Sequence, residues 1–382
     1  MISSLSDRSQ YSSLADCTYL NQASLGLICQ PAVSAMHTYL DDIGRHGNLR
    51  MSDADEVAFF SPLREQAAAI MNCPPERLAI MSSAGEMLSQ LPYLFRPSAG
   101  SKIIAVSSDF PAITRPWIAY AEAHDNEIQF VDEHIDRNLT EALIQNIDDR
   151  TSVVAVSYVQ FSTGTRTDIH RLREATRQVG ALLVVDVTQA AGAIPIDANS
   201  WDADVVVCSG YKWLGGHGGV GLAVMSPEFL TQPPPAPGWM GAPDPFDMQA
   251  TRLPLANDAR RYTQSTMSYV SLTGLTVAIA ELLAMGPERI EAHAESLAAL
   301  LVEELDGSGW TPFRSIDDEA ASAHIVTLGH PEGGVEDAVK TLRDANFICG
   351  SRGGRIRISL AHYNDENDVR SLVQLLRQGS SH

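Results

Sequence analysis

Two apolar runs, each followed by a charged residue, decide the fold of this chain. The first, VVDVTQAAGA, covers residues 184–193, and the second, VVVCSGYKWLGGHGG, covers residues 205–219. Continuous runs of β-branched residues are typical of strands that are buried on both faces of a parallel sheet. Ligands bind beyond the carboxyl ends of such strands. We therefore expect Asp186 and Lys212 to lie at the same edge of a sheet, where a site can form.

Similar apolar runs recur along the chain and alternate with helical stretches. The expected strands cover residues 78–81, 103–106, 153–159, 182–187, 205–208 and 221–225. Residues 167–180 predict a helix that Thr167 or Asp168 begins and Gly180 ends. Another helix is expected over about residues 53–71. This alternation predicts an α/β fold with a parallel sheet between helices.

The pattern changes after about residue 270. A long helical region, a strand-like run, a helix, the run RIRISL at 355–360 and a final helix follow. We therefore expect a large domain over residues 20–270 and a small α+β domain over 1–19 and 271–382. Residues 231–247 are rich in proline, which lacks a backbone donor and fixes φ, so they predict a long surface loop. Its Trp239 and Met240 could also line the mouth of a site.

The composition narrows the class of protein. The chain has 382 residues, 45% hydrophobic and 19% charged, which allows a large core. A formal net charge of −20 disfavours nucleic acid and anionic membranes as partners. We expect no membrane span, no signal peptide and, because the five cysteines are scattered without a CxxC pair, no disulfide frame or metal site. These features favour a cytoplasmic protein.

The pair of Asp186 and Lys212 indicates covalent chemistry. A lysine near a fixed carboxylate, followed by the glycine-rich run GGHGGVG at 215–221, suits a residue that forms an imine with an aldehyde. Taken alone, each residue could equally be a structural carboxylate or a surface lysine. It is their combination that indicates a site.

These residues match known motifs. D-x-x-Q at 186–189, S-x-x-K at 209–212 and R-x-S at 357–359 resemble the class V aminotransferase family of fold-type I pyridoxal-phosphate (PLP) enzymes. That family includes cysteine desulfurases, kynureninase, isopenicillin-N-epimerase-like proteins and cysteine C–S lyases. The resemblance extends from YLNQASLG (19–26) to RISLAHYN (357–364). It implies a large domain with a mainly parallel seven-stranded sheet, PLP as cofactor, an amino-acid substrate, and a homodimer with shared active sites.

The resemblance assigns roles around the cofactor ring. Lys212 would bind the PLP aldehyde and later move the proton at the substrate Cα. Asp186 would hold the proton of the pyridine nitrogen, which PLP needs in order to draw electrons from the substrate. Gln189 would bond the ring hydroxyl or help to orient the ring. Phe110 would stack on the ring face, as in kynureninase-like relatives.

The resemblance also assigns residues to the cofactor phosphate. The stretch MSSAGEM at 81–87 lies between an expected strand and an expected helix, so its N–H groups can point at an anion. The implied phosphate residues are Ser83 and Ala84, with Ser82 as a further candidate, Ser209, Tyr211, which stands where many relatives have a histidine, and Thr266, which would reach the neighbouring subunit. For each hydroxyl the alternative is a helix cap or a loop contact.

The substrate side rests on Arg357, which by resemblance would bind the α-carboxylate through two parallel hydrogen bonds. Alternate strand residues face the same way, so Arg355 shares the face of Arg357 and could compete for this role. Asn21 and Ser24 match the family segment near the substrate side chain. Desulfurases carry a catalytic thiolate on a loop before this arginine. Here the loop is short, and Cys349 ends an expected buried strand, which disfavours a desulfurase.

The resemblance then favours a carbon–sulfur lyase that acts on an L-cysteine S-conjugate. Such an enzyme would release a thiol, pyruvate and ammonia by β-elimination, as lyases of natural-product biosynthesis do in ergothioneine or lincosamide pathways. Decarboxylation coupled to oxidative deamination, epimerisation and transamination are the alternatives. A PLP-binding protein without activity and a non-enzymatic scaffold are both disfavoured, because a scaffold would need none of Lys212, Asp186 and Arg357.

Overall fold

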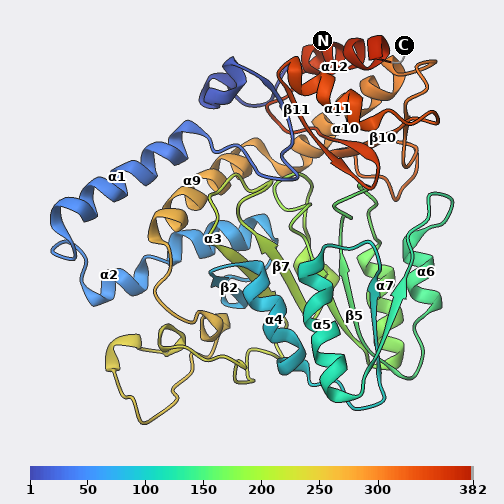
Figure 1. The fold of residues 1–382 in the computed structure, drawn as a ribbon. Coiled ribbons are helices and arrows are strands. Elements are labelled where there is room, and N and C mark those ends of the chain that lie inside the picture. Colours follow the sequence, from blue (N-terminus) through green and yellow to red (C-terminus); the bar gives the residue numbers. More distant parts are fainter. Residues whose placement is uncertain (380–382) are drawn as a thin grey trace.

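The larger of two β-sheets forms the centre of the molecule in the computed structural model, which describes residues 1–379 (Figure 1). Its strand order is β2-β8-β7-β6-β5-β3-β4, and only the pairs that include β8 are antiparallel. Its strands are β2 (Leu78–Met81), β3 (Lys102–Val106), β4 (Glu127–Val131), β5 (Thr151–Ser157), β6 (Leu182–Asp186), β7 (Val205–Ser209) and β8 (Gly221–Met225). The predicted mainly parallel, seven-stranded sheet is confirmed.

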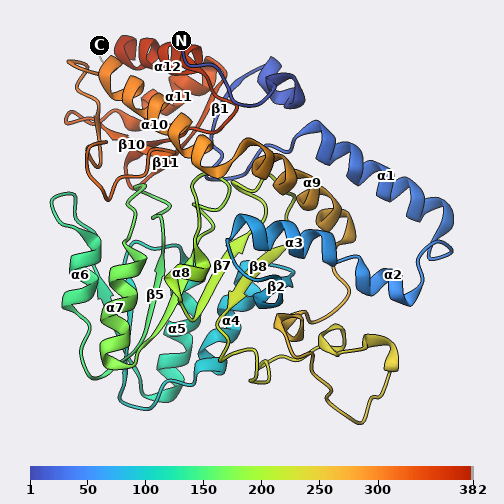
Figure 2. The same cartoon turned by 180° about the vertical axis from the view of Figure 1, so that it is seen from behind.

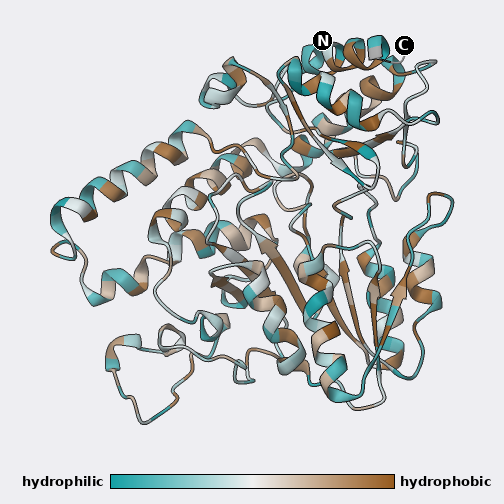
Figure 3. Cartoon of the chain, in the orientation of Figure 1, coloured by the Kyte–Doolittle hydropathy of each residue, from teal (hydrophilic) through white to brown (hydrophobic). Residues whose placement is uncertain are grey.

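Helices cover both faces of this sheet, as Figures 1 and 2 show from opposite sides. On one face lie α4 (Ala84–Phe95) and α5 (Pro111–His124), whose apolar side chains share a core cluster with the strands. On the other lie α3 (Ser61–Ile70), α6 (Leu139–Gln145), α7 (Ile169–Val179) and α8 (Ala198–Trp201). The strands between them are strongly apolar in Figure 3, as burial on both faces requires.

The predicted helix over 167–180 is α7, and its ends have the expected chemistry. The side chain of Asp168 accepts a hydrogen bond from the Arg171 N–H at 3.1 Å, and Gly180 ends the helix with a φ of 75°. The single helix predicted over 53–71 is instead two helices, α2 (Asp53–Ala58) and α3. Pro62 lies in the first turn of α3, where its missing N–H costs no helical hydrogen bond.

The strand β4 is absent from the sequence-based prediction. It lies at the edge of the sheet and pairs only with β3. Of its five residues, EIQFV, only Val131 is buried. A strand that is not buried on both faces has no continuous apolar run. Such runs were the basis for predicting the neighbouring strands, so β4 was not predicted.

The smaller sheet lies above the carboxyl ends of the central strands, near both chain termini (Figure 1). Its order is β1-β11-β12-β10-β9, with β1 parallel to β11 and the other pairs antiparallel. Its strands are β1 (Thr18–Leu20), β9 (Thr311–Pro312), β10 (Ile325–Gly329), β11 (Phe347–Arg352) and β12 (Arg355–Ser359). Its core includes side chains from α10 (Pro287–Glu304), α11 (Val335–Asp344) and α12 (Glu366–Gly379). The predicted smaller α+β part is therefore present, while the domain limits at residues 20 and 270 stay predictions.

Two segments extend from the central sheet. The helix α1 (Gln30–His46) packs against α9 (Tyr269–Met285), which also contacts α3. The proline-rich loop forms only short 3₁₀ turns, at Trp239–Gly241 and Pro245–Asp247. Met240 is buried, and the Trp239 indole donates to Ser265 at 3.3 Å. The loop therefore packs along the segment that precedes α9.

Within residues 1–379, no single helix is both long and apolar enough to cross a membrane. The helices α9 and α10 reach the required length and composition only as a pair, and the pair is bent by 74° at its break. Many apolar residues of both helices are buried in the protein.

Candidate active site

Asp186 and Lys212 meet at the carboxyl ends of two neighbouring strands. Asp186 is the last residue of β6, and Lys212 follows Ser209, the last residue of β7, by three positions. Both side chains are buried, each with 6% exposure. Burial lowers the pKa of Lys212 to about 8, and the negative charge of Asp186 partly opposes this shift. The structure thus brings together the two residues on which the sequence analysis depends.

The buried Asp186 carboxylate is suited to pair with a positively charged ligand group. Burial raises its pKa, and a hydrogen bond from the Thr188 N–H at 2.7 Å, together with Lys212, acts in the opposite direction. A buried carboxylate is stabilised most by a positively charged hydrogen-bond donor. A protonated pyridine nitrogen is such a donor, so this residue fits the PLP ring.

The amine of Lys212 is suited to bond formation. Its Nζ lies 5.2 Å from the centre of the Phe110 ring and 5.9 Å from that of Tyr211. With a pKa of about 8, much more of this amine is neutral near neutral pH than in an ordinary lysine, and only the neutral amine attacks an aldehyde or accepts a proton.

The N-terminal segment fixes the backbone at Lys212. The Gln22 side chain donates to the Lys212 carbonyl at 2.9 Å, and the Gly26 N–H donates to the Tyr211 carbonyl at 3.0 Å. A Cβ on Gly26 would lie 2.1 Å from the Lys212 carbonyl oxygen, so only glycine fits there. Sequence reasoning did not assign a role to Gln22, because a buried glutamine in a loop carries no motif of its own.

A buried acid positions Phe110. Asp109 accepts hydrogen bonds from the Ser157 N–H at 2.8 Å, the Ser157 hydroxyl at 2.6 Å, the Gln160 amide at 3.1 Å and the Phe110 N–H at 2.7 Å. Burial raises the pKa of Asp109 to about 6, although these bonds oppose the shift. The Phe110 ring meets the Phe161 ring edge-on at 5.4 Å. Sequence reasoning missed Asp109, although an acid after an apolar run was the signal that found Asp186.

Gln189 connects four segments around the site. Its side-chain amide donates to the Ala23 carbonyl at 3.0 Å and accepts from the Trp213 indole at 2.9 Å. Its backbone carbonyl lies 2.6 Å from Nε2 of His324, whose pKa burial lowers to about 4. A neutral His324 can donate this hydrogen bond. Because both ends of the Gln189 amide bond to the protein, the geometry favours the orienting role over a direct bond to the ring hydroxyl.

The predicted phosphate segment begins α4. Ser83 is its N-cap, with the hydroxyl accepting from the Glu86 N–H at 3.0 Å, and Ala84 is its first residue. The Ser82 hydroxyl also bonds to Glu86. A Cβ on Gly221 would lie 2.4 Å from the Ala84 nitrogen, so a glycine in β8 lets this turn approach the sheet. Both serine hydroxyls take part in the cap, and the Glu86 N–H is bonded to Ser83, so Ala84 and Gly85 offer the N–H groups that could bind an anion.

The other predicted phosphate residues fall into two groups. Ser209 and Tyr211 stand beside the central pair, and the Ser209 N–H donates to the Thr188 hydroxyl at 3.1 Å. Burial, and to a lesser degree Asp186, raises the pKa of Tyr211, so its phenol stays protonated and can donate. Thr266 is exposed in the segment before α9. A residue that serves a neighbouring subunit has to be exposed in this way.

Arg357 gathers the predicted substrate residues on the other side of the site. It is 1% exposed and donates from Nη1 to the Phe161 carbonyl at 2.8 Å and from Nη2 to the Ser24 hydroxyl. Its Nε and the Oδ1 of Asn21 are buried without a hydrogen-bond partner within the described chain. A Cβ on Gly350 would lie 3.0 Å from that Oδ1 and 3.5 Å from that Nε, so the two groups lie close together. Such unpaired buried groups are costly unless a ligand pairs with them.

Arg355 shares the face but not the position. Its guanidinium lies over the Phe313 ring at 5.2 Å and beside Gly329. Arg357, by contrast, is among the positive charges that lower the pKa of Lys212. The geometry therefore favours Arg357 as the group that faces the reacting atoms.

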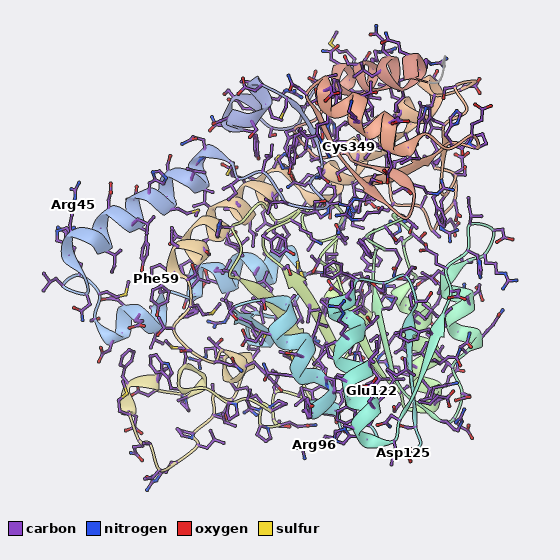
Figure 4. The ribbon with its side chains drawn as sticks, in the orientation of Figure 1. Arg45, Phe59, Arg96, Glu122, Asp125 and Cys349 are labelled. Carbon is purple, nitrogen blue, oxygen red and sulfur yellow. The ribbon has the colours of Figure 1, made fainter. Side chains whose placement is uncertain are left out.

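Cys349 lies on the opposite face of the small sheet. Gly350 is the residue that pairs with Arg357, so its neighbour Cys349 points the other way. Cys349 packs against the apolar core of the small sheet, where Figure 4 labels it. Burial raises the pKa of this thiol to about 11, which keeps it protonated at neutral pH.

Known proteins resemble this chain over nearly its full length. The profile of the aminotransferase class-V family matches residues 18–372. An uncharacterized aminotransferase of Bacillus subtilis, YcbU, is 24% identical over 388 residues, covering 98% of each chain. The cystine C-S lyase C-DES has the same fold, with 19% identity in two structures. Its complex with cysteine persulfide gives a TM-score of 0.86 over 96% of this chain and 99% of that one. Its K223A mutant, with glycine linked to the PLP cofactor, gives 0.88 over 97% and 99%.

Proposed function

Because this chain belongs to the aminotransferase class-V family, we propose that it is a lyase that cleaves the Cβ–S bond of an L-cysteine S-conjugate. The family and the cofactor predicted from the sequence are confirmed: the chain is a PLP-dependent enzyme. The type of reaction and the substrate are our proposal. The proposal is based on the presence of Arg357 near Lys212 and on the position of Cys349 away from the site.

The residues around Lys212 suit the cofactor in charge and shape. PLP, when bound, draws electron density from the bonds of the substrate Cα, provided its pyridine nitrogen is protonated. Asp186 would hold that proton, Phe110 would cover one ring face, and the first turn of α4 would bind the phosphate. Lys212 would bind the aldehyde. Gln189 would orient the ring through the segments that it connects.

The substrate would be held by its α-carboxylate. Arg357 offers Nε, which has no partner among the described residues, and terminal nitrogens that can exchange Ser24 or Phe161 for a ligand. Two parallel hydrogen bonds to a carboxylate fix its orientation as well as its position. The adjacent Asn21 Oδ1 can accept a hydrogen bond from the substrate. These contacts would place the substrate Cα beside the Lys212 amine.

Once the substrate amine has replaced Lys212 on the cofactor aldehyde, the freed Lys212 amine would move one proton. Its neutral amine takes the proton from Cα, and the electron pair of that C–H bond expels the thiolate from Cβ. The thiolate leaves as the thiol once it gains a proton, and water completes the conversion of the remaining carbon skeleton to pyruvate and ammonia. A pKa of about 8 suits this step, because proton transfer is most efficient when the pKa of the base lies near the working pH.

The observation that supports elimination most is the position of the thiols. A desulfurase needs a reactive thiolate at the substrate sulfur. Cys349 faces the apolar core, and Cys208 in β7 is fully buried, with a pKa raised by burial. With both thiols protonated and Cys349 on the opposite face of the sheet from Arg357, transfer of sulfur to the protein is disfavoured and release of a free thiol is favoured.

A panel of cysteine S-conjugates, followed by mass spectrometry of the products, tests this proposal. Thiol and pyruvate in equal amounts are expected, with no product from Lys212→Ala. Borohydride should abolish the visible absorbance of the wild-type enzyme by fixing the cofactor on Lys212. Carbon dioxide and an aldehyde, an epimerised substrate, an amino-group transfer product or a persulfide on Cys349 would each contradict elimination.

We further propose a homodimer in the cytoplasm. The exposed position of Thr266 supports a site completed by a second subunit, and the five free cysteines suit a reducing compartment. Mixing Lys212→Ala and Thr266→Ala subunits tests the shared site. If Thr266 serves the neighbouring site, hybrid dimers should contain one site with neither substitution and recover activity that each variant lacks.

A further inference from the structure

Three arginines on one face of the small sheet have no acidic partner among residues 1–379. In the hairpin of β11 and β12, Arg352 pairs with Arg355 and Gly350 pairs with Arg357, so the three side chains share one face. None of them forms an ion pair with an acidic side chain in the described chain. In a protein with a formal net charge of −20, such a cluster of cations needs an explanation.

Arg352 acts on the reacting side of this face. Its positive charge is among those that lower the pKa values of both Lys212 and Arg357. Its side chain is exposed, and Nη1 donates to the Ser351 carbonyl at 2.7 Å. The other N–H groups of the Arg352 guanidinium do not pair with any carboxylate of the described chain. Arg355, in contrast, is stacked on Phe313.

One anion does not require both groups. Arg357 by itself offers the two parallel donors that an α-carboxylate takes. Arg352 is two strand positions from the residue that pairs with Arg357, which is about 7 Å along the strand. The two positive charges on the same face repel each other, and a ligand with two anionic groups would relieve that repulsion at both ends.

We propose that Arg352 is a specificity-determining residue that binds a second anionic group, carried by the substrate side chain. The inference rests on the proposed function and names its substrate class: cysteine S-conjugates whose sulfur substituent ends in a carboxylate. The α-carboxylate binds Arg357, the distal carboxylate binds Arg352, and the Cβ–S bond lies between them. Arg352 takes no part in the transfer of the proton.

A matched pair of ligands tests this role. S-(2-carboxyethyl)-L-cysteine and S-(2-carbamoylethyl)-L-cysteine have the same shape and differ only in distal charge. In the wild-type holoenzyme, kcat/KM for the acid should exceed that for the amide by about two- to fivefold, as expected for one ion pair formed by an exposed arginine. In Arg352→Gln this ratio should fall to about one, mainly through a higher KM for the acid. Arg355→Gln is the matched control and should keep the wild-type ratio.

A binding measurement keeps this inference separate from the proposed function. Calorimetry with the PLP-loaded Lys212→Ala variant measures the Kd of each ligand without turnover, and the Arg352→Gln substitution is added on that background. A preference for the acid that depends on Arg352 supports the inference even if the wild-type enzyme eliminates neither ligand, in which case only the proposed reaction fails. Equal affinity for both ligands overturns the inference. An equal loss for both ligands in Arg352→Gln also overturns it, because Arg352 would then serve the shared α-carboxylate.

Discussion

The two sides of the site differ in how their polar groups are satisfied. On the side of the large sheet, Asp109 and Gln189 bond almost entirely to the protein itself. On the side of the small sheet, Arg357 Nε and Asn21 Oδ1 are buried without a partner in the described chain. We therefore expect the large-sheet side to be largely organised before a ligand binds, and the small-sheet side to be completed by the ligand.

This difference matches what each side has to do. A cofactor that stays bound through every turnover benefits from residues held in fixed positions. A substrate that enters and leaves has to replace weak or missing contacts, because displacing a satisfied partner would cost affinity. Substitutions on the first side should therefore reduce the rate of the chemical step, and those on the second should reduce substrate affinity.

The largest effect is expected for Asp186→Asn. An amide cannot hold the pyridine proton, so kcat should fall by about 10²- to 10³-fold, the usual cost of losing one preorganised electrostatic partner. Steady-state kinetics with an S-conjugate that the wild-type enzyme cleaves measure this change in kcat. Asp204→Asn is the control, because Asp204 is an equally buried acid that pairs with Arg173 at the opposite end of β7. A similar loss in both variants would mean that general destabilisation, and not the pyridine contact, lowers the rate.

A smaller effect, in a different constant, is expected for Arg357→Gln. Losing a charge-assisted pair of hydrogen bonds should raise KM about 10- to 100-fold and change kcat less. Arg355→Gln should leave KM near the wild-type value, because Arg355 stacks on Phe313. If Arg355→Gln raised KM and Arg357→Gln did not, the assignment of the two arginines would be reversed.

Because the Lys212 amine is buried, we expect its removal to stabilise the protein by an amount that depends on pH. Its pKa is about 8 in the folded protein, below the usual lysine value of 10.5, so the folded state binds fewer protons than the unfolded state between these pH values. The destabilisation by Lys212 is therefore full below pH 8 and disappears as the pH rises through 10.5. Lys212→Met in the cofactor-free protein should raise the free energy of unfolding by about 2 kcal/mol more at pH 7 than at pH 10. Urea unfolding at both pH values measures this, and a gain that did not depend on pH would contradict a buried, titrating amine.

The smallest effect is expected for Cys349→Ala. A protonated thiol that faces away from Arg357 takes no part in catalysis, so kcat/KM should change by less than about twofold. The matched variant Cys208→Ala should behave in the same way. A loss of activity confined to Cys349→Ala would place this thiol in the reaction and reopen the case for a desulfurase.

The sequence was most informative where one residue type serves one chemical purpose. Asp186 and Lys212 followed from apolar runs that end at one edge of a parallel sheet, and the buried strands followed from the same runs. The edge strand β4 did not, because a strand with one buried residue has no such run. Nor did the break between α2 and α3 at Pro62, which resembles a proline inside one helix until the fold is known.

The supporting residues of the site were less accessible to sequence reasoning. Asp109, Gln22 and His324 act through partners 48, 190 and 135 positions away, and no local pattern encodes such contacts. The part played by Arg352 depends on the strand register that places it on the same face as Arg357. Alternation along a single strand could relate Arg355 to Arg357, but it could not relate them to a residue across the hairpin.

One chain of contacts joins the two sides of the site. Arg357 donates to the carbonyl of Phe161, the Phe161 ring meets the Phe110 ring at 5.4 Å, and that ring lies 5.2 Å from the Lys212 amine. A carboxylate that draws Arg357 away from Phe161 would also disturb the aromatic pair that borders the reactive nitrogen. Binding of the substrate carboxylate by Arg357 would then be coupled to the position of the aromatic rings beside Lys212. An amine without a carboxylate would therefore bind weakly, and the fraction that does bind would react slowly.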